Sequence, residues 1–164
     1  MIKLIVLDVD GTLTDGKIIY DDKGGEYKAF CVKDGLGIAA WIRLGRSVAI
    51  ITGRDSSIVE KRAKELKVQH LRQGVADKAA ALREIVESQG LDFSEVAVIG
   101  DDLNDLPMIN LAKYSFAPKN AVKEVKKSVK KVLKSRGGDG AVREMIEKIL
   151  KKDKLQDKFY ALFV

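Results

Sequence analysis

The chain has 164 residues, of which 46% are hydrophobic and 33% charged. This is the composition of a folded globular protein and excludes a disordered or fibrous chain. No apolar run reaches the ~18 residues that cross a bilayer, so we expect no membrane association. The formal net charge of +6 comes largely from lysine-rich stretches at 119–136 and 148–158. Few aromatic residues are interleaved there, which favours a solvated basic face, and we expect no nucleic-acid partner.

The single cysteine, Cys31, excludes an internal disulfide and is consistent with a reducing compartment. The opening residues lack the cleavage pattern of a signal peptide. We therefore expect a cytoplasmic protein in which residues 1–164 form one domain of ordinary size.

The first half of the chain alternates between predicted strands and helices. Leu4–Leu7 is apolar and partly β-branched, which predicts a strand buried on both faces. Residues 17–20 and 26–30 flank a Gly-rich turn and predict a β-hairpin. Asp34 is the predicted N-cap of the helix that follows. The remaining predicted elements of this half are a strand at 47–51, a helix at 56–66 and a short strand at 68–71.

The second half continues this alternation. Its clearest helix is predicted at 138–151, where apolar residues recur at helical spacing. Gly90 is the predicted C′ residue of an earlier helix. Residues 129–133 are ambiguous between strand and helix. The other predicted elements are a helix at 77–89, a strand at 95–99, a helix at 106–111, a strand at 114–116 and a helix at 120–127.

Strands that alternate with helices are typical of α/β proteins built from right-handed βαβ units. We therefore predict a three-layer, Rossmann-like parallel sheet with helices on both faces and a β-hairpin, at about 17–30, inserted after the first strand. A C-terminal tail is expected at about 152–164. Its apolar end, Phe159–Val164, would be an unusual exposed segment. We expect it to dock on the core of this chain or on another subunit.

Acidic side chains follow two of the predicted buried strands. Asp8 and Asp10 come directly after the first strand, and Asp101, Asp102 and Asp105 follow the strand at 95–99. Ligand sites of open α/β sheets lie beyond the carboxyl ends of the strands, so we expect these acids to lie close together. Clustered carboxylates without a His or Cys cluster suit Mg²⁺ rather than zinc.

The same edge of the predicted sheet carries groups that suit a phosphate ester. Thr52 offers a hydroxyl, Gly53 a backbone N–H and Lys78 a positive charge. Together with a metal ion, these groups can hold a phosphoryl group and neutralise its developing charge. One aspartate can then act as the nucleophile. A second aspartate two residues along can protonate the leaving alkoxide and later activate water.

The segment Asp8-Val9-Asp10-Gly11-Thr12 resembles the DxDx[TV] signature of the haloacid-dehalogenase-like hydrolases. Thr52, Lys78 and Gly100–Asp105 resemble the second, third and fourth motifs of that family, in the same order. The resemblance implies that Asp8 is the nucleophile, that Asp10 is the general acid/base, and that Thr52 and Lys78 bind phosphate. It also implies that Mg²⁺ is held by the carboxylates of Asp8 and Asp101 and by the backbone carbonyl of Asp10. Asp102 and Asp105 would orient these ligands.

The spacing of the motifs leaves no room for a cap domain, because each gap between motifs holds only one or two short elements. Over nearly its whole length the chain is similar to capless members of the family that hydrolyse 3-deoxy-D-manno-octulosonate 8-phosphate (KDO 8-phosphate), on the way to lipopolysaccharide. That resemblance implies a homotetramer assembled through the hairpins, in which the C-terminal segment reaches an adjacent active site.

The same resemblance implies further contacts with a phosphorylated sugar-acid substrate. Basic side chains make chemical sense there because arginine binds a carboxylate with two parallel hydrogen bonds. One departure is Ala39, at a position where we expect an arginine; Arg43 and Arg46 are candidates to replace it. The implied contact residues, besides Asp10, Thr52, Gly53 and Lys78, are Cys31, Val32, Lys33, Asp34, Gly35, Arg54 and Arg62.

Two other functions stay open. One is a capless phosphatase of a related sugar phosphate, such as a nonulosonate 9-phosphate. The other is a catalytically idle subunit with the same fold, although the intact motif residues speak against it. The segment Gly137–Gly140 also allows two interpretations, an anion-binding or mobile loop, or a tight start of the helix that follows.

Overall fold

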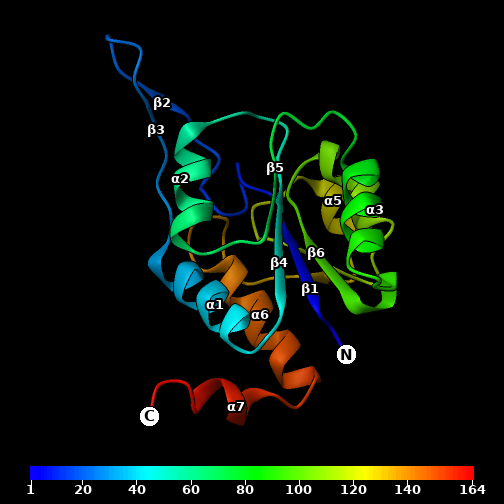
Figure 1. The fold of residues 1–164 in the computed structure, drawn as a ribbon. Coiled ribbons are helices and arrows are strands. Elements are labelled where there is room, and N and C mark those ends of the chain that lie inside the picture. Colours follow the sequence, from blue (N-terminus) through cyan, green and yellow to red (C-terminus); the bar gives the residue numbers. More distant parts are fainter.

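The computed structural model describes all 164 residues, which form a parallel sheet enclosed by helices (Figure 1). The six strands have the order β5-β4-β1-β6-β7-β8, and each neighbouring pair is parallel. The predicted α/β class is confirmed. The strands are β1 (Leu4–Leu7), β4 (Ser47–Ile51), β5 (His70–Arg72), β6 (Val96–Ile99), β7 (Tyr114–Ala117) and β8 (Lys131–Val132).

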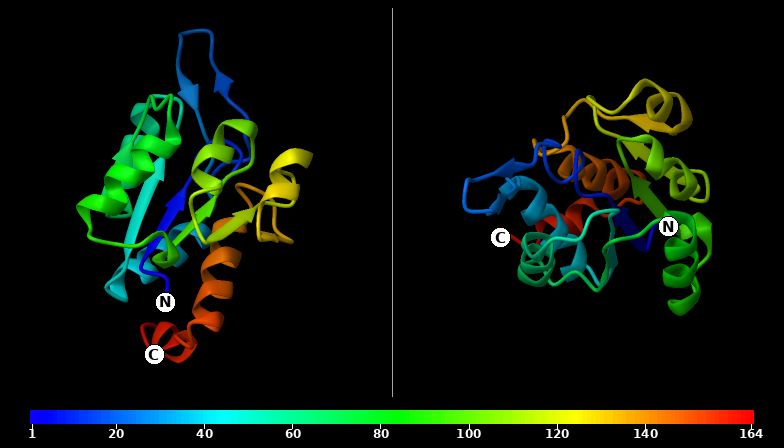
Figure 2. Two further views of the ribbon diagram at one scale, coloured as in Figure 1. Left: turned by 90° about the vertical axis from the view of Figure 1, so that its right-hand side faces the viewer. Right: turned by 90° about the horizontal axis from the view of Figure 1, so that it is seen from above.

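Helices cover both faces of the sheet (Figure 2), as predicted. One hydrophobic core joins one face to α1 (Val32–Arg43), α2 (Ser57–Glu65), α6 (Ala141–Lys152) and α7 (Gln156–Tyr160). A second core joins the other face to α3 (Lys78–Ser88), α4 (Leu106–Ile109) and α5 (Lys123–Ser128). Two 3₁₀ turns, η1 (Phe93–Glu95) and η2 (Leu103–Asp105), precede β6 and α4. None of the helices has the length and apolar character needed to cross a membrane.

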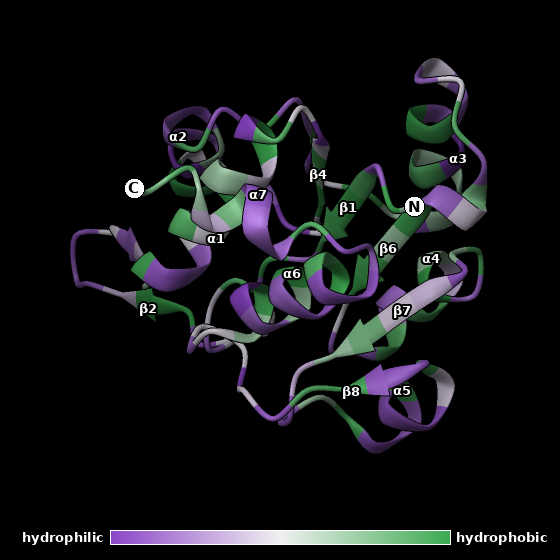
Figure 3. Cartoon of the chain, turned by 90° about the horizontal axis from the view of Figure 1, so that it is seen from below, coloured by the Kyte–Doolittle hydropathy of each residue, from purple (hydrophilic) through white to green (hydrophobic).

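Strand β1 lies at the centre of the sheet, and all four of its residues are buried. Ile5 and Leu7 belong to the first core, whereas Leu4 and Val6 belong to the second. A strand covered on both faces needs a continuous apolar run, which explains the sequence of β1. Viewed from below, β1 and β6 are strongly hydrophobic, whereas the outward sides of the surrounding helices are polar (Figure 3).

The predicted hairpin is also present. Strands β2 (Ile19–Tyr20) and β3 (Glu26–Tyr27) pair in antiparallel fashion and rise from the end of the molecule opposite α7 (Figures 1 and 2). The carboxylate of Asp21 closes the turn by accepting hydrogen bonds from the backbone N–H groups of Lys23 and Gly25.

The structure corrects the sequence prediction in several places, and helices α5 and α6 each begin three residues later than predicted, at Lys123 and Ala141. Helix α1 begins at Val32 with Cys31 at its N-cap position, so the assignment of Asp34 as N-cap was wrong. Strand β5 begins at His70 rather than at residue 68, because the N–H of Val68 still bonds to the carbonyl of Ala63 at the end of α2. The ambiguous segment at 129–133 forms the short edge strand β8.

The C-terminal tail docks on the core of its own chain, as one of the two alternatives predicted. Phe159 of α7 is 1% exposed and packs within the first core. A guanidinium N–H of Arg43 donates to the carbonyl of Leu162 at 3.2 Å. Helix α7 lies beside α6 (Figure 3), at the far end of the molecule from the hairpin.

Candidate active site

Strand register brings the three predicted motif segments to one edge of the sheet. Leu7 of β1 pairs with Ile50 of β4 and with Ile99 of β6. Because the strands are parallel, the polar residues that follow them leave the sheet at the same edge. Asp8 continues the alternation of Leu4 and Val6, which places its side chain on the face covered by α3.

Lys78, the first residue of α3, extends into this edge from a helix that Asp77 caps. Its Nζ donates to Oδ1 of Asp8 at 2.7 Å and to Oδ1 of Asp105 at 2.6 Å. Burial lowers the pKa of Lys78, but the two ion pairs outweigh burial and the pKa lies above its usual value. Lys78 is therefore a buried ammonium at the centre of the site, held by two carboxylate partners.

Three carboxylates surround this ammonium. Asp8, Asp101 and Asp105 each offer an oxygen, and these oxygens lie within 4.8 Å of one another. Burial, followed by repulsion from Asp105, raises the pKa of Asp8 well above its usual value and that of Asp101 to about 6. Two of the three carboxylates are in excess of the one lysine and repel each other, and a divalent cation bound there would relieve this repulsion. Oxygen donors of this kind suit Mg²⁺.

Asp105 is the least suited of the three to bind a metal directly. Its Oδ1 accepts from Lys78, and its Oδ2 accepts from the backbone N–H groups of Asp101 and Asp102 at 2.8 and 3.2 Å. Both oxygens therefore already have protein partners that hold Lys78 and the loop after β6 in place. The side chain of Asp102 caps η2 by accepting from the N–H of Leu103.

Glycines allow the loops of the site to approach each other closely. Gly11 has φ +98°, and a Cβ atom there would lie 2.0 Å from Oδ2 of Asp101. A Cβ on Gly137 would lie 1.8 Å from the carbonyl oxygen of Gly11, and the N–H of Gly138 donates to the carbonyl of Thr12. Gly140, at φ +91°, is the N-cap residue of α6. The Gly137–Gly140 segment therefore forms a tight helix start that supports the loop after β1.

The hairpin contributes two charged residues that sequence reasoning missed. The ammonium of Lys28 is ion-paired with Oδ1 of Asp10, and it lies 3.5 Å from Oε1 of Glu26. Arg54, in the loop after β4, lies 3.6 Å from the same Glu26 oxygen. The one signal in the sequence is that Glu26 and Lys28 are two residues apart on a short strand, and so share a side of it.

A cavity of about 310 Å³ opens between these loops, and no hydrophobic residue lines it. Seven of the residues predicted for the site line it, so these residues meet at one edge of the sheet. Gly16 and Asn104 line it as well and were not predicted. The lining residues are Asp8, Asp10, Gly16, Thr52, Gly53, Arg54, Asp101, Asp102 and Asn104.

Of the other predicted substrate contacts, Lys78 meets the cavity through its ion pair with Asp8, and the rest lie outside it within a single chain. They comprise Arg62 and the segment from Cys31 to Gly35. The guanidinium of Arg62 lies 5.6 Å from the ring centre of Phe30, and Val32 is 79% exposed. Lys33 lines a separate open cavity beside the start of α6.

Asp34 connects two helices rather than the cavity. Its side chain is buried, and Oδ1 accepts a hydrogen bond of 2.7 Å from the backbone N–H of Arg143, in the first turn of α6. Burial raises the pKa of Asp34, although this amide partly offsets the effect. The carboxylate therefore caps a helix that begins more than 100 residues further along the chain.

The two arginines proposed to replace the residue missing at Ala39 are engaged elsewhere. Arg43 contacts the C-terminal tail through Leu162 and lies over the ring of Phe163. The guanidinium of Arg46 lies 5.0 Å from the ring centre of Trp41. Neither lines the cavity at the carboxyl edge.

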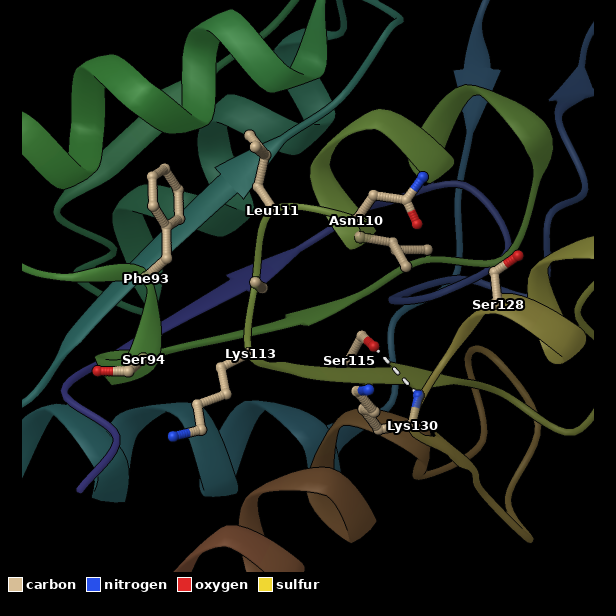
Figure 4. A pocket seen from close by; sticks show the side chains of 10 residues that line it. Phe93, Ser94, Asn110, Leu111, Lys113, Ser115, Ser128 and Lys130 are labelled. Atoms are coloured by element: carbon tan, nitrogen blue, oxygen red, sulfur yellow. Dashed lines mark hydrogen bonds between the residues drawn. The ribbon is translucent and has the colours of Figure 1, made fainter.

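A second cavity, of about 390 Å³, lies near the starts of β6 and β7, at the opposite edge of the sheet (Figure 4). Its lining includes Phe93, Asn110, Lys113 and Ser115, and the backbone N–H of Lys130 donates to the hydroxyl of Ser115 at 3.1 Å. It contains no acidic residue. It therefore lacks carboxylate ligands for a metal ion.

Aspartates line a pocket at the carboxyl edge of a Rossmann-like sheet, and a buried lysine forms ion pairs beside it. This is the arrangement of a phosphoryl-transfer enzyme. A family model described as haloacid dehalogenase-like hydrolase matches residues 70–146. The chain is 40% identical over 149 residues to the KDO 8-phosphate phosphatase KdsC of Haemophilus influenzae, covering 91% of this chain and 83% of the relative. The corresponding values for the KdsC protein of Yersinia pestis are 41%, 94% and 83%, over 156 residues.

A solved structure gives the same result. The KDO 8-phosphate phosphatase of Moraxella catarrhalis, in complex with magnesium, phosphate and KDO, matches with a TM-score of 0.96 and 44% identity. The match covers 99% of this chain and 94% of that one. The chain belongs to the haloacid dehalogenase-like hydrolases and, within them, to the KDO 8-phosphate phosphatase family.

Proposed function

We propose that this protein is a Mg²⁺-dependent phosphatase that hydrolyses KDO 8-phosphate to KDO and phosphate, in the synthesis of lipopolysaccharide precursors. The observation that carries the proposal is the buried ion-pair set of Lys78 with Asp8 and Asp105, beside Asp101. Relatives that are 40–41% identical carry this activity in their names. The similar M. catarrhalis structure contains magnesium, phosphate and KDO together.

The metal site is proposed to consist of the carboxylates of Asp8 and Asp101 and the backbone carbonyl of Asp10. The excess of carboxylates over lysine in the cluster supports a divalent ion. When bound, Mg²⁺ neutralises negative charge on the phosphoryl group. Asp105 holds Lys78 and the loop after β6, and so orients the ligands.

In the proposed first step, a carboxylate oxygen of Asp8 attacks the phosphorus atom of the substrate. The bond between phosphorus and the sugar oxygen breaks, and its electron pair stays on the sugar oxygen. Asp10 gives a proton to that oxygen, so KDO leaves as an alcohol and Asp8 carries the phosphoryl group. The position of Asp10 in the lining of the pocket, two residues from Asp8, supports this role.

In the proposed second step, the ionised Asp10 takes a proton from a water molecule whose oxygen attacks phosphorus. The bond between phosphorus and the Asp8 oxygen breaks, phosphate leaves, and both aspartates return to their starting states. Thr52, the N–H of Gly53 and Lys78 would bind the phosphoryl oxygens in both steps. Arg54 lines the same pocket and would face the sugar acid.

The remaining substrate contacts are proposed to act between subunits. Arg62 and the Cys31–Gly35 segment lie outside the pocket of their own chain. Apolar side chains on the hairpin, Ile19, Tyr20 and Tyr27, are more than half exposed, which supports an interface there. We therefore infer a cytoplasmic homotetramer in which these contact residues reach a neighbouring pocket.

Phosphate release from KDO 8-phosphate, beside a panel of sugar phosphates and nucleotides, tests the reaction. Each assay is run with Mg²⁺, with EDTA and with Asp8→Asn, whose side chain is nearly isosteric with aspartate. We expect a strong preference for KDO 8-phosphate that is lost in both controls. If phosphate is released from a nonulosonate 9-phosphate instead, in a metal-dependent way, then that compound is the substrate and KDO 8-phosphate is not. If no ester releases phosphate, the protein is a catalytically idle subunit.

A second variant tests the division of labour between the aspartates. Asp10→Asn should keep Mg²⁺ affinity, because its proposed metal ligand is a backbone carbonyl, while phosphate release falls by at least about 100-fold. Isothermal titration with Mg²⁺ measures the first quantity. Loss of metal binding in this variant would make the Asp10 side chain a ligand and overturn the assignment.

Mixed tetramers of two low-activity variants test whether Arg62 of one chain reaches the pocket of a neighbouring chain. Asp8→Asn and Arg62→Ala chains, unfolded together and refolded, would form mixed tetramers in which some pockets combine an intact Asp8 with an intact Arg62 from a neighbour. We expect partial recovery of activity over either variant alone. Activity that equals the weighted sum of the separate variants would place Arg62 in the site of its own chain, or outside any site.

A further inference from the structure

Lys28 is the one hairpin residue whose charge is completely withdrawn from solvent. The exposed fraction of its side chain is 0%, yet it lies on an inserted hairpin outside the main sheet. Its ammonium contacts two carboxylates, Oδ1 of Asp10 and Oε1 of Glu26. Burying an amine is costly unless it is paired, so these two contacts are needed to hold the Lys28 side chain in this position.

The contacts of Glu26 hold this lysine in a defined place. Oε2 of Glu26 accepts a hydrogen bond of 3.3 Å from the hydroxyl of Ser56, just before α2. A guanidinium N–H of Arg54 donates to the hydroxyl of Tyr20 at 3.0 Å. Both strands of the hairpin are thereby bonded to the loop after β4, which forms one wall of the pocket.

The carboxylate of Asp10 is held on one side only. Oδ1 accepts from Lys28, whereas Oδ2 has no protein partner, and the side chain lines the pocket at 20% exposure. Rotation of the carboxylate would break the contact with the buried ammonium. The free oxygen is therefore the one available to a leaving oxygen or a water molecule in the pocket.

We propose that Lys28 is a positioning residue for the acid/base step, and that the hairpin, through Glu26 and Lys28, sets the orientation of the Asp10 carboxylate. The inference rests on the proposed function, because it assigns a partner to the aspartate that transfers the proton. The general acid is effective only within hydrogen-bond reach of the leaving oxygen, so loss of orientation would slow that transfer.

The leaving group of the substrate separates this role from a structural one. The alkoxide of a sugar needs a proton as it departs, whereas p-nitrophenolate, a far weaker base, leaves without one. The ratio kcat/KM reports the steps up to release of the alcohol, so it isolates the first proton transfer. The measurement is kcat/KM of the wild type and of Lys28→Met with KDO 8-phosphate and with p-nitrophenyl phosphate, both at saturating Mg²⁺.

We expect Lys28→Met to lower kcat/KM for KDO 8-phosphate by at least about 10-fold and that for p-nitrophenyl phosphate by less than about threefold. Lys23→Met, which removes an exposed lysine from the hairpin turn, is the matched control and should change neither value. Equal losses on the two substrates would make Lys28 a phosphate-binding or purely structural residue. No loss on KDO 8-phosphate would likewise overturn the proposal.

Glu26→Gln keeps the proposal testable if Lys28→Met does not fold. It leaves Lys28 in place but removes one of the two charges that hold it, so a smaller loss with the same leaving-group dependence is expected. A Glu26→Gln loss of equal size on both substrates would count against the proposal. Failure of the proposed function itself has a separate signature, since the wild type would then release no phosphate from KDO 8-phosphate.

Discussion

The ammonium of Lys78 lies 2.7 Å from Oδ1 of Asp8, and solvent reaches almost none of either side chain. This pair joins the first turn of α3 to the end of β1. Lys78 is the one positive charge among the carboxylates of Asp8, Asp101 and Asp105. Through this ion pair, Lys78 both holds α3 against the end of β1 and forms part of the proposed catalytic site.

Replacement of this lysine should damage activity and stability together. Lys78→Met leaves three mutually repelling carboxylates, so phosphate release should fall by at least about 100-fold. The free energy of unfolding should fall by about 3–5 kcal/mol, as for other broken buried pairs. Steady-state kinetics and urea unfolding measure the two effects, and Lys61→Met, on the exposed side of α2, is the control. A stable variant with the wild-type rate would contradict this interpretation of the site.

The metal-free protein should lose stability as the pH rises through the range from about 4 to 6. The fold raises the pKa of Asp101 from 3.8 to about 6, so the native state binds more protons than the unfolded state within that window. Stability therefore falls with rising pH there, and the raised pKa of Asp8 acts in the same direction. Thermal unfolding in EDTA measures the trend, which Mg²⁺ at pH 7 should reverse and Asp101→Asn should reduce. A melting temperature that rises over this window in EDTA would exclude the mechanism.

The contact between Gly137 and Gly11 should tolerate no side chain. A Cβ at residue 137 would lie 1.8 Å from the Gly11 carbonyl oxygen, so Gly137→Ala must displace the loop that carries Asp8 and Asp10. We expect a loss of stability of more than about 2 kcal/mol together with reduced activity. Gly45→Ala is the control, because it has a positive φ of +74° in open space and should show only backbone strain of about 1–2 kcal/mol. Equal effects of the two substitutions on stability and activity would show that strain, not the close approach, decides the outcome.

Weakening the contact between the C-terminal tail and the core should lower the free energy of unfolding and leave the pocket unchanged. Phe159→Ala removes a buried aromatic ring from the core and should lower the free energy of unfolding by about 3–5 kcal/mol. Because α7 lies at the end of the molecule opposite the hairpin, the Mg²⁺ affinity of the folded fraction should be unchanged. Phe163→Ala, at a ring that is 45% exposed, is the control and should cost less than about 1 kcal/mol. Similar destabilisation by the two changes would indicate a different path of the tail.

Much of the site was predictable because its residues follow buried strands. The apolar run of β1 and that of β6 each end in aspartates, and parallel strands deliver such residues to one edge. The convergence of Asp8 and Asp101 with Thr52 therefore needed only the hydrophobic pattern and the order of the elements. Helix α6 was equally clear, since its apolar residues repeat at helical spacing.

Other features depended on contacts that no local pattern indicates. Asp34 looked like the N-cap of its own helix, yet its carboxylate caps α6 instead. Nothing in the sequence of the hairpin indicated that Lys28 is buried against Asp10. The Cys31–Gly35 segment was expected at the pocket, but within one chain it lies outside.

The sequence by itself determined the fold class, the edge of the sheet that carries the site, and the carboxylate and phosphate-binding chemistry. Periodicity and strand-end residues are local properties, and they act in the same way wherever the elements pack. Only the tertiary structure decided which charged groups meet, because the placement of the hairpin and of α6 depends on many weak contacts summed over the chain. For that reason the partner of Asp10 could be identified only in the folded molecule.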